Sequence, residues 1–214
     1  MSRRPISLFS GTLAIAAAFG LAACTTPQLV TGAAKAAFED RKTETQILDT
    51  KITARILGRL ADRDKMLVID VTMDVWEGRV LVTGTLDAAK ERQAVIALIG
   101  EDERIADVYD EIQIVTPAEK EERRELSEKA KAGAESVGQS VNDFWIETKI
   151  NAQLVTTRGV TSVNYRWRCV RKNVFLIGRA RGAEELDQVL KIIRATEGVE
   201  SVTHYVYIKP ADAS

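Results

Sequence analysis

Apolar residues recur at every fourth position early in the chain and alternate with polar residues soon after. Three of them follow Asp49 at helical spacing: Ile52, Ile56 and Leu60. This spacing predicts an amphipathic helix whose first turn is capped by Asp49. Apolar and polar residues then alternate along 70–76 and along 80–86, with Glu77 and Gly78 between them, which predicts two strands joined by a tight turn. A second helical pattern and a last strand complete the unit.

The same order of patterns appears twice. At an offset of 94 residues, residues 49–115 align without gaps on 143–209. Matched positions include Asp49 with Asp143, Leu60 with Leu154, Val80 with Val174, Gly84 with Gly178 and Ile114 with Ile208. A repeat of this length indicates a duplicated domain, because solenoid repeats span about 20 to 50 residues. We expect an α+β fold of two tandem αββαβ domains, each with two helices packed on one face of a three-stranded mixed sheet.

The N-terminal segment has the pattern of a bacterial lipoprotein signal. Arg3 and Arg4 precede an uncharged, mainly apolar stretch over 6–20, and Leu-Ala-Ala-Cys24 follows it. This order resembles the lipobox, and the resemblance implies cleavage before Cys24 and acylation of its thiol. The alternative is an uncleaved membrane anchor, because about 18 apolar residues can just span a bilayer.

The lipoprotein interpretation sets the compartment. Residues 1–23 are then a removed signal peptide, and 24–45 form a tether acylated at Cys24. Acyl chains bury enough CH₂ groups to hold a soluble domain at a membrane. Thr25 follows the Cys where lipoproteins kept in the inner membrane commonly have Asp, so by that rule the protein is anchored to the periplasmic face of the outer membrane.

Composition excludes several classes of function. The chain has 30 Lys+Arg against 31 Asp+Glu, one His and two Cys. With His204 alone, a Ser-His-Asp triad or a multi-histidine metal site has almost nothing to be built from. A balanced charge gives no support to nucleic-acid binding. Cys169 falls on the inward side of its strand and is expected to be a small core residue.

Each unit resembles a BON domain. The resemblance rests on the Ile-x3-Ile-x3-Leu helix, the strands ending at Gly84 and Gly178, the Gly198–Val202 string, and the strings 108–112, 142–146, 148–149 and 153–154. A lipobox followed by two such units is similar to the dual-BON outer-membrane lipoproteins. The domains are expected at 46–115 and 143–209, with a short tail at 210–214. They are joined by a linker at 116–142, where the sequence departs from the family, whose linker is shorter and contains Gly. The linker is rich in helix formers with opposite charges three or four apart, which predicts a solvated helix after Pro117.

The two copies differ in charge. Residues 46–115 carry 9 basic and 14 acidic residues, net −5, whereas 143–209 carry 11 and 7, net +4. Strand alternation places a basic, aromatic set on the sheet face away from the helices of the second copy, as a candidate binding face: Arg166, Arg168, Arg179, Arg181, Tyr205 and Tyr207. The alternatives are a solvated face or an intramolecular partner for the acidic domain.

The copies also differ at the start of their first helix. Thr50 and Lys51 in the first become Phe144 and Trp145 in the second. Trp is favoured where one end of its side chain meets an apolar environment and the other meets water, as at a bilayer surface. In the dual-BON lipoproteins this helix contacts anionic phospholipid, so the resemblance implies a phospholipid contact made of Phe144, Trp145, Thr148, Lys149 and Ala152. The alternative is that the aromatic pair covers the core or packs on the first domain.

These observations predict a non-enzymatic, outer-membrane-anchored periplasmic protein with no cofactor and no metal. Its expected ligands are anionic phospholipids, phosphatidylglycerol and cardiolipin, and the resemblance implies support of outer-membrane integrity with enrichment at division sites. The second hypothesis is a periplasmic scaffold that holds envelope proteins through the Arg/Tyr face or the charged linker, without lipid recognition.

Overall fold

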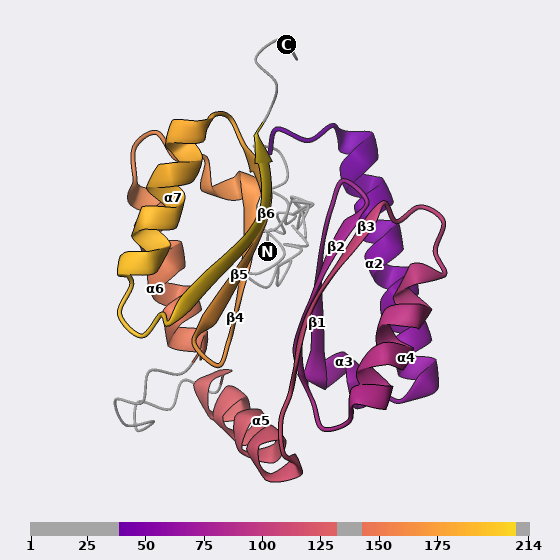
Figure 1. The fold of residues 1–214 in the computed structure, drawn as a ribbon. Coiled ribbons are helices and arrows are strands. Elements are labelled where there is room, and N and C mark those ends of the chain that lie inside the picture. The colour runs from indigo at the N-terminus through magenta and orange to yellow at the C-terminus, as the bar shows by residue number, and fades with distance from the viewer. Residues whose placement is uncertain (1–38, 132–142, 209–214) are drawn as a thin grey trace, which may run out of the picture.

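The structure, a computed structural model, describes residues 39–131 and 143–208 (Figure 1). The predicted signal peptide 1–23, the acylation site Cys24 and the tail 210–214 lie outside these residues. No helix in the described part of the chain combines the length and the apolar character that crossing a membrane requires.

Two αββαβ units make up the described chain, as predicted. The first comprises α2 (Thr43–Arg63), α3 (Leu67–Asp70), β1 (Val71–Trp76), β2 (Arg79–Leu86), α4 (Ala89–Gly100) and β3 (Asp107–Ile114). The second comprises α6 (Asp143–Thr156), the 3-10 turn η1 (Ser162–Asn164), β4 (Tyr165–Val170), β5 (Asn173–Ala180), α7 (Ala183–Ala195) and β6 (Ser201–Ile208). In each sheet the central strand is antiparallel to the strand before it and parallel to the strand after α4 or α7, so the predicted mixed sheet is confirmed.

The apolar periodicity seen in the sequence forms the core of each unit. Ile52, Ile56 and Leu60 on α2 are fully buried, as are their counterparts on α6: Ile146, Ile150 and Leu154. They pack against inward side chains of the strands and of α4 or α7. Each unit therefore has its own hydrophobic core, as a domain does.

Asp49 has a different role from the one expected. The helix α2 begins at Thr43, so Asp49 lies inside it and cannot cap it. Its carboxylate instead accepts hydrogen bonds from the backbone N–H groups of Glu77 (2.8 Å) and Gly78 (2.9 Å) in the β1–β2 turn. Both turn residues have positive φ, 53° and 74°. Asp49 thus joins the helix to a turn whose donors would otherwise be buried without partners.

Asp143 repeats this arrangement in the second domain. It accepts from the N–H groups of Arg171 and Lys172, both at 2.8 Å, in the β4–β5 turn. These two residues also have positive φ, 51° and 64°, although neither is glycine. The shared Asp is therefore a helix-to-hairpin clamp in both copies.

Replacing Asp49 with alanine should destabilise the first domain by about 2 kcal/mol or more, because two buried donors and the guanidinium of Arg41 lose their acceptor. Urea unfolding measures the loss. The matched control is Asp62→Ala, an exposed change near the C-terminus of the same helix, where a carboxylate has no favourable dipole interaction. Equal unfolding free energies for the two variants would contradict the clamp.

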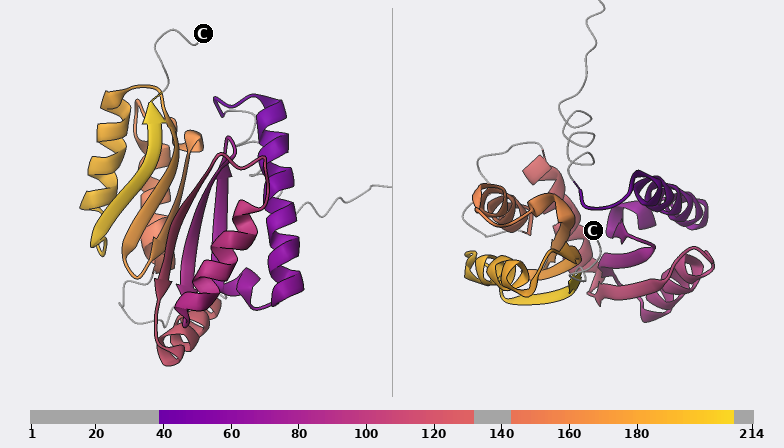
Figure 2. Two further views of the ribbon diagram at one scale, coloured as in Figure 1. Left: turned by 45° about the vertical axis from the view of Figure 1, so that its right-hand side comes forward. Right: turned by 90° about the horizontal axis from the view of Figure 1, so that it is seen from above.

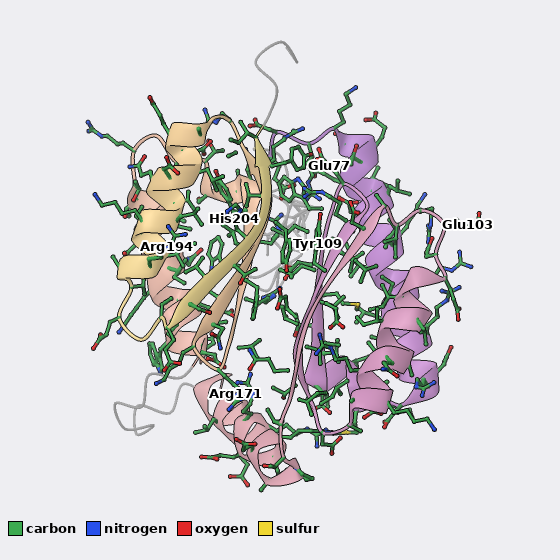
Figure 3. The ribbon with its side chains drawn as sticks, viewed as in Figure 1. Glu77, Glu103, Tyr109, Arg171, Arg194 and His204 are labelled. Carbon is green, nitrogen blue, oxygen red and sulfur yellow. The ribbon has the colours of Figure 1, made fainter. Side chains whose placement is uncertain are left out.

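The two sheets pack face to face, with α2, α4, α6 and α7 on the outside (Figure 2). The faces away from the helices share a cluster of buried side chains: Trp76, Leu81, Val170, Phe175 and Ile177. Tyr109 lies between the sheets (Figure 3) and stacks on Tyr205 with ring centroids 4.0 Å apart. The molecule is therefore layered: the two sheets form the inner layers, and the helices of each domain form the outer ones.

Equivalent positions of the two copies face each other across this interface. Asp74 pairs with Arg168, and Glu111 with the hydroxyl of Tyr205; the partners of each pair are separated by 94 residues, the length of the repeat. The β1–β2 and β4–β5 turns lie at opposite ends of the molecule (Figure 1). Contacts between like positions are the property of a two-fold axis, so the chain is arranged like a symmetric dimer fused into one polypeptide.

The linker helix is confirmed, and its expected solvation holds for part of its surface. The helix α5 (Pro117–Lys131) follows Thr116, whose hydroxyl accepts from the N–H of Glu119 while the Glu119 carboxylate accepts from the Thr116 N–H, a capping box. Lys120, Arg123 and Arg124 bind buried or half-buried carboxylates, whereas several other residues of the helix are exposed: Pro117, Ala118, Glu119, Glu121, Glu122 and Glu125. Arg124 pairs with Asp70 through two hydrogen bonds (2.6 and 2.7 Å). Arg123 pairs with Asp143 of the second domain at 2.6 Å.

Candidate functional site

The outer face of α6 presents the residues predicted to contact lipid. Because Ile146, Ile150 and Leu154 point into the core, the positions between them point away from it. Phe144 is 42% exposed and Trp145 is 44% exposed, with their rings 5.8 Å apart in an edge-to-face contact. Thr148 and Ala152 are exposed as well, and Lys149 is partly exposed. The aromatic pair is therefore not enclosed in the core, and the alternative that it covers the core from outside stays open.

Two polar members of this set have partners within the chain. The Lys149 ammonium pairs with Glu197 at 2.7 Å, and this hydrogen bond lowers the pKa of the Glu197 carboxyl. Both side chains are well exposed, so the ion pair is weak and open to exchange. Thr148 donates its hydroxyl proton to the carbonyl of Phe144, one turn back.

A groove of about 870 Å³ runs between α6 and the edge strand β4. We call it the α6–β4 groove; it is lined by Phe144, Thr148, Val155, Val163, Arg166 and Trp167, among others. Val155 is 59% exposed and was not picked out from the sequence. The available signal was spacing, because Phe144, Thr148, Asn151 and Val155 form one stripe at intervals of four, three and four residues.

The predicted open basic face is corrected, because the first domain covers it. Arg168 makes two hydrogen bonds to Asp74, at 2.6 and 2.9 Å. Arg179 pairs with Glu77 at 3.1 Å, and Arg166 pairs with Glu39. The alternative of an intramolecular partner for the acidic domain is therefore what the structure shows for Arg168 and Arg179. Arg166 pairs with a residue that precedes that domain, and its guanidinium lies 5.4 Å from the ring centroid of Trp76.

The remaining members of the basic face divide between the interface and solvent. Tyr205 is stacked and hydrogen-bonded as described above, and Tyr207 lies under the guanidinium of Arg79, 4.2 Å from its ring centroid. Arg79 also donates to the carbonyls of Tyr205 (2.9 Å) and Gly178 (3.1 Å). The Arg181 side chain stays 58% exposed. Its Nε lies 3.9 Å from a carboxylate oxygen of Asp40 and 4.0 Å from one of Glu185.

The thiol and imidazole show no activated arrangement. Cys169 is 4% exposed, and burial raises the pKa of its thiol, which disfavours the reactive thiolate. His204 points to the same side of β6 as Val202 and Val206 but is exposed. Among the residues that the structure describes, no group of three or more His, Cys, Asp and Glu side chains could hold a metal ion.

Comparison with known proteins agrees with this architecture. The BON domain family matches residues 48–116 and 142–210, which are the two αββαβ units. A protein of Anaplasma centrale, described as an uncharacterized protein in the gshII 5′ region, is 31% identical over 139 residues, which make up 65% of this chain and 82% of that protein.

Two solved structures show weaker likeness. CdsD, a structural protein of the type III secretion system of Chlamydia trachomatis, has a TM-score of 0.30 at 12% identity and covers 75% of this chain and 93% of its own. The C-terminal domain of CdsD has a TM-score of 0.29 at 13% identity, over 69% and 96% of the two chains. The chain described here belongs to the BON domain family and carries two BON domains.

Proposed function

We propose that this protein is anchored by acyl chains to the periplasmic face of the outer membrane, and that its second BON domain binds anionic phospholipid through the outer face of α6. BON domains occur in periplasmic and membrane-associated proteins and are in general non-enzymatic. The observation that supports the proposal is the exposed aromatic pair at the start of α6, Phe144 and Trp145.

The chemistry of this face fits a bilayer surface. Exposed aromatic rings bury apolar area when they enter the boundary between headgroups and acyl chains. Lys149 lies one turn beyond Trp145, and its exposed pair with Glu197 can give way to a lipid phosphate. Each cation near an anionic leaflet contributes about 1 kcal/mol, so the site is weak and sensitive to lipid composition.

Because acyl chains would anchor the protein, the lipid site on α6 does not need high affinity. Acyl chains on Cys24 would hold α6 near the leaflet and raise the effective concentration of lipid at the site. Such a site selects among membrane regions by headgroup without supplying the anchoring energy itself. The proposed role is support of outer-membrane integrity, with enrichment at division sites, and phosphatidylglycerol and cardiolipin are the proposed ligands.

Trp145→Glu should abolish flotation of the unacylated mature chain with vesicles that contain phosphatidylglycerol or cardiolipin. The change removes the ring and adds a negative charge next to anionic headgroups. Co-flotation at low salt, with purely zwitterionic vesicles alongside, measures it.

Thr50→Glu is the matched control, because Thr50 is the exposed counterpart of Phe144 in the first domain and the substitution changes the charge by the same amount. This variant should float like the wild type. If the wild-type chain fails to float with anionic vesicles, the proposed function is wrong.

The scaffold alternative loses most of the basic surface on which it was based. The Arg/Tyr face is largely covered by the first domain, and Lys120, Arg123 and Arg124 of α5 bind carboxylates of both domains. No observation on the described residues favours it over lipid binding.

A further inference from the structure

The turn that contains α3 exposes three apolar side chains, which we call the α3 patch: Met66, Val68 and Ile69. Ile69 is 57% exposed, more than either aromatic residue at the start of α6. Leu67, within the same turn, is buried in the core of the first domain. Exposed apolar side chains that lie together, unlike single ones, indicate a surface that binds another surface.

The fold does not impose this exposure. Ser162 is the counterpart of Val68 in the second domain, and Val160 and Val163 stand at the other two positions. All three counterparts are partly buried. The α3 patch is therefore specific to the first domain.

The α3 patch is held in a fixed position. The buried side chain of Leu67 anchors its middle in the core. At one end the Asp64 carboxylate accepts from the N–H of Met66 at 2.8 Å. At the other end Asp70 is bound by Arg124 through two hydrogen bonds. A surface that is ordered before it meets a partner loses little conformational entropy on binding.

The α3 patch and the aromatic pair of α6 lie at the same end of the molecule. Asp143, the first residue of α6, binds the β4–β5 turn, and Figure 1 shows that turn, α5 and α3 at one end. Adjacent residues of α5 hold both elements. Arg123 pairs with Asp143, and Arg124 pairs with the last residue of α3, Asp70. The two apolar sites therefore flank α5.

The surface between the two sites is continuous. A pocket of about 310 Å³ is lined by Met66 and Ile69 on one side and by Glu147 of α6 on the other. Glu147 also lines the α6–β4 groove, together with Phe144. A broad surface that covers the start of α6 would therefore also reach the α3 patch.

We propose that the α3 patch enters the same anionic bilayer as Phe144 and Trp145, so that both domains contact one membrane. This inference rests on the proposed function. A bilayer fits better than a protein partner, because each apolar site is small, whereas a stable protein interface covers about 800 Å² of each partner. A bilayer buries separate apolar side chains at once, each at the boundary between headgroups and acyl chains.

Charges beside the α3 patch balance one another. Arg63 and Lys65 are exposed there, and so are Asp62 and Asp64. This end of the first domain is therefore locally neutral and does not repel an anionic leaflet, although the domain as a whole is acidic. The α3 patch adds apolar burial and fixes the orientation of the molecule, while Lys149 on α6 supplies the preference for anionic lipid.

Ile69→Glu should lower the partitioning of the unacylated mature chain onto phosphatidylglycerol vesicles about tenfold, because a side chain that leaves water on binding becomes a charged one. Co-flotation at low salt over a series of lipid concentrations measures it. Ile47→Glu is the matched control, since Ile47 is 50% exposed near the start of α2, at the opposite end of that helix from α3. This variant changes the charge by the same amount and should bind like the wild type.

A fluorescent label reports on the α3 patch without adding a charge to it. In the mature chain with Cys24→Ser, Ile69→Cys and Ile47→Cys each carry an environment-sensitive fluorophore, and Cys169 stays unlabelled because it is buried. Phosphatidylglycerol vesicles should shift the emission of the label at position 69 to shorter wavelength. The emission of the label at position 47 should not change.

The outcomes separate this inference from the proposed function. If the wild type floats, Trp145→Glu does not, and both measurements at Ile69 match those at Ile47, the first domain does not contact the bilayer and the inference is wrong while the proposed function stands. If the wild type sediments as a dimer without lipid and Ile69→Glu sediments as a monomer, the α3 patch binds a second copy, which also overturns the inference. If the wild type does not float at all, the proposed function is wrong and the inference falls with it.

Discussion

Gly84→Ala is expected to destabilise the first domain by about 3 kcal/mol or more. Gly84 has φ of 131°, a conformation that side chains rarely adopt. A Cβ built there would lie 2.0 Å from the carbonyl oxygen of Asp70 and 3.0 Å from the Cα of Val71, both backbone atoms of the neighbouring strand region. Backbone cannot move aside as a flexible side chain can, so β1 would have to separate from β2. Urea unfolding of the full mature chain measures the loss.

The matched control changes stability in the opposite direction. Gly58 lies at an exposed position within α2, and a Cβ there would meet no atom within 4 Å. Gly58→Ala should therefore stabilise the same domain by about 1 kcal/mol through helix propensity. The argument fails if Gly84→Ala leaves the unfolding free energy within experimental error of the wild type. Gly178, whose added Cβ would lie 2.2 Å from the carbonyl oxygen of Asn164, should behave like Gly84.

Arg168→Asp should weaken the contact between the two domains by about 2 kcal/mol. The substitution places a carboxylate against Asp74, whose side chain is 8% exposed, and leaves that charge without its two hydrogen bonds. We take the lower end of the range for such pairs because the Arg168 side chain is 36% exposed and solvent screens it. Small-angle X-ray scattering should show a larger radius of gyration, since the domains separate while each keeps its own core.

Reversing both charges should restore most of the contact. The double variant Asp74→Arg with Arg168→Asp again has one acidic and one basic residue at these two positions. Comparing it with the single variants gives a double-mutant cycle. Restoration should be incomplete, because Glu147 lies 4.0 Å from the Arg168 guanidinium and would then face a carboxylate. A double variant as expanded as Arg168→Asp would show that this pair does not hold the domains together.

The periodic part of the fold could be predicted from the sequence because it depends on local patterns repeated twice. Ile52, Ile56 and Leu60 identify the buried side of α2 from spacing alone. Asp49 shows the limit of that approach, since the residues before it carry little apolar periodicity and the two extra turns of α2 are not visible. An Asp that caps a helix and an Asp inside the helix that binds a distant turn both precede the same apolar spacing. The sequence alone does not distinguish them.

Strand alternation correctly assigned which side chains face away from the helices, but it contains no information on what covers that face. Arg168 and Asp74 occupy the same position of the repeat with opposite charge, and this complementarity was present in the sequence. Recognising it required knowing that equivalent faces meet. The α6–β4 groove was missed for a similar reason, because Val155 and Trp167 become neighbours only when the helix packs beside the edge of the sheet.

The two-fold arrangement of the copies has a consequence for how the molecule behaves on dilution. A dimer of separate chains dissociates as its concentration falls, whereas two faces on one polypeptide meet at an effective concentration fixed by the connection between them. Here that connection includes α5, which is ion-paired to both domains. The sheet faces are therefore occupied by each other at any abundance of the protein, and their opposite charges disfavour exchange with the like face of another copy.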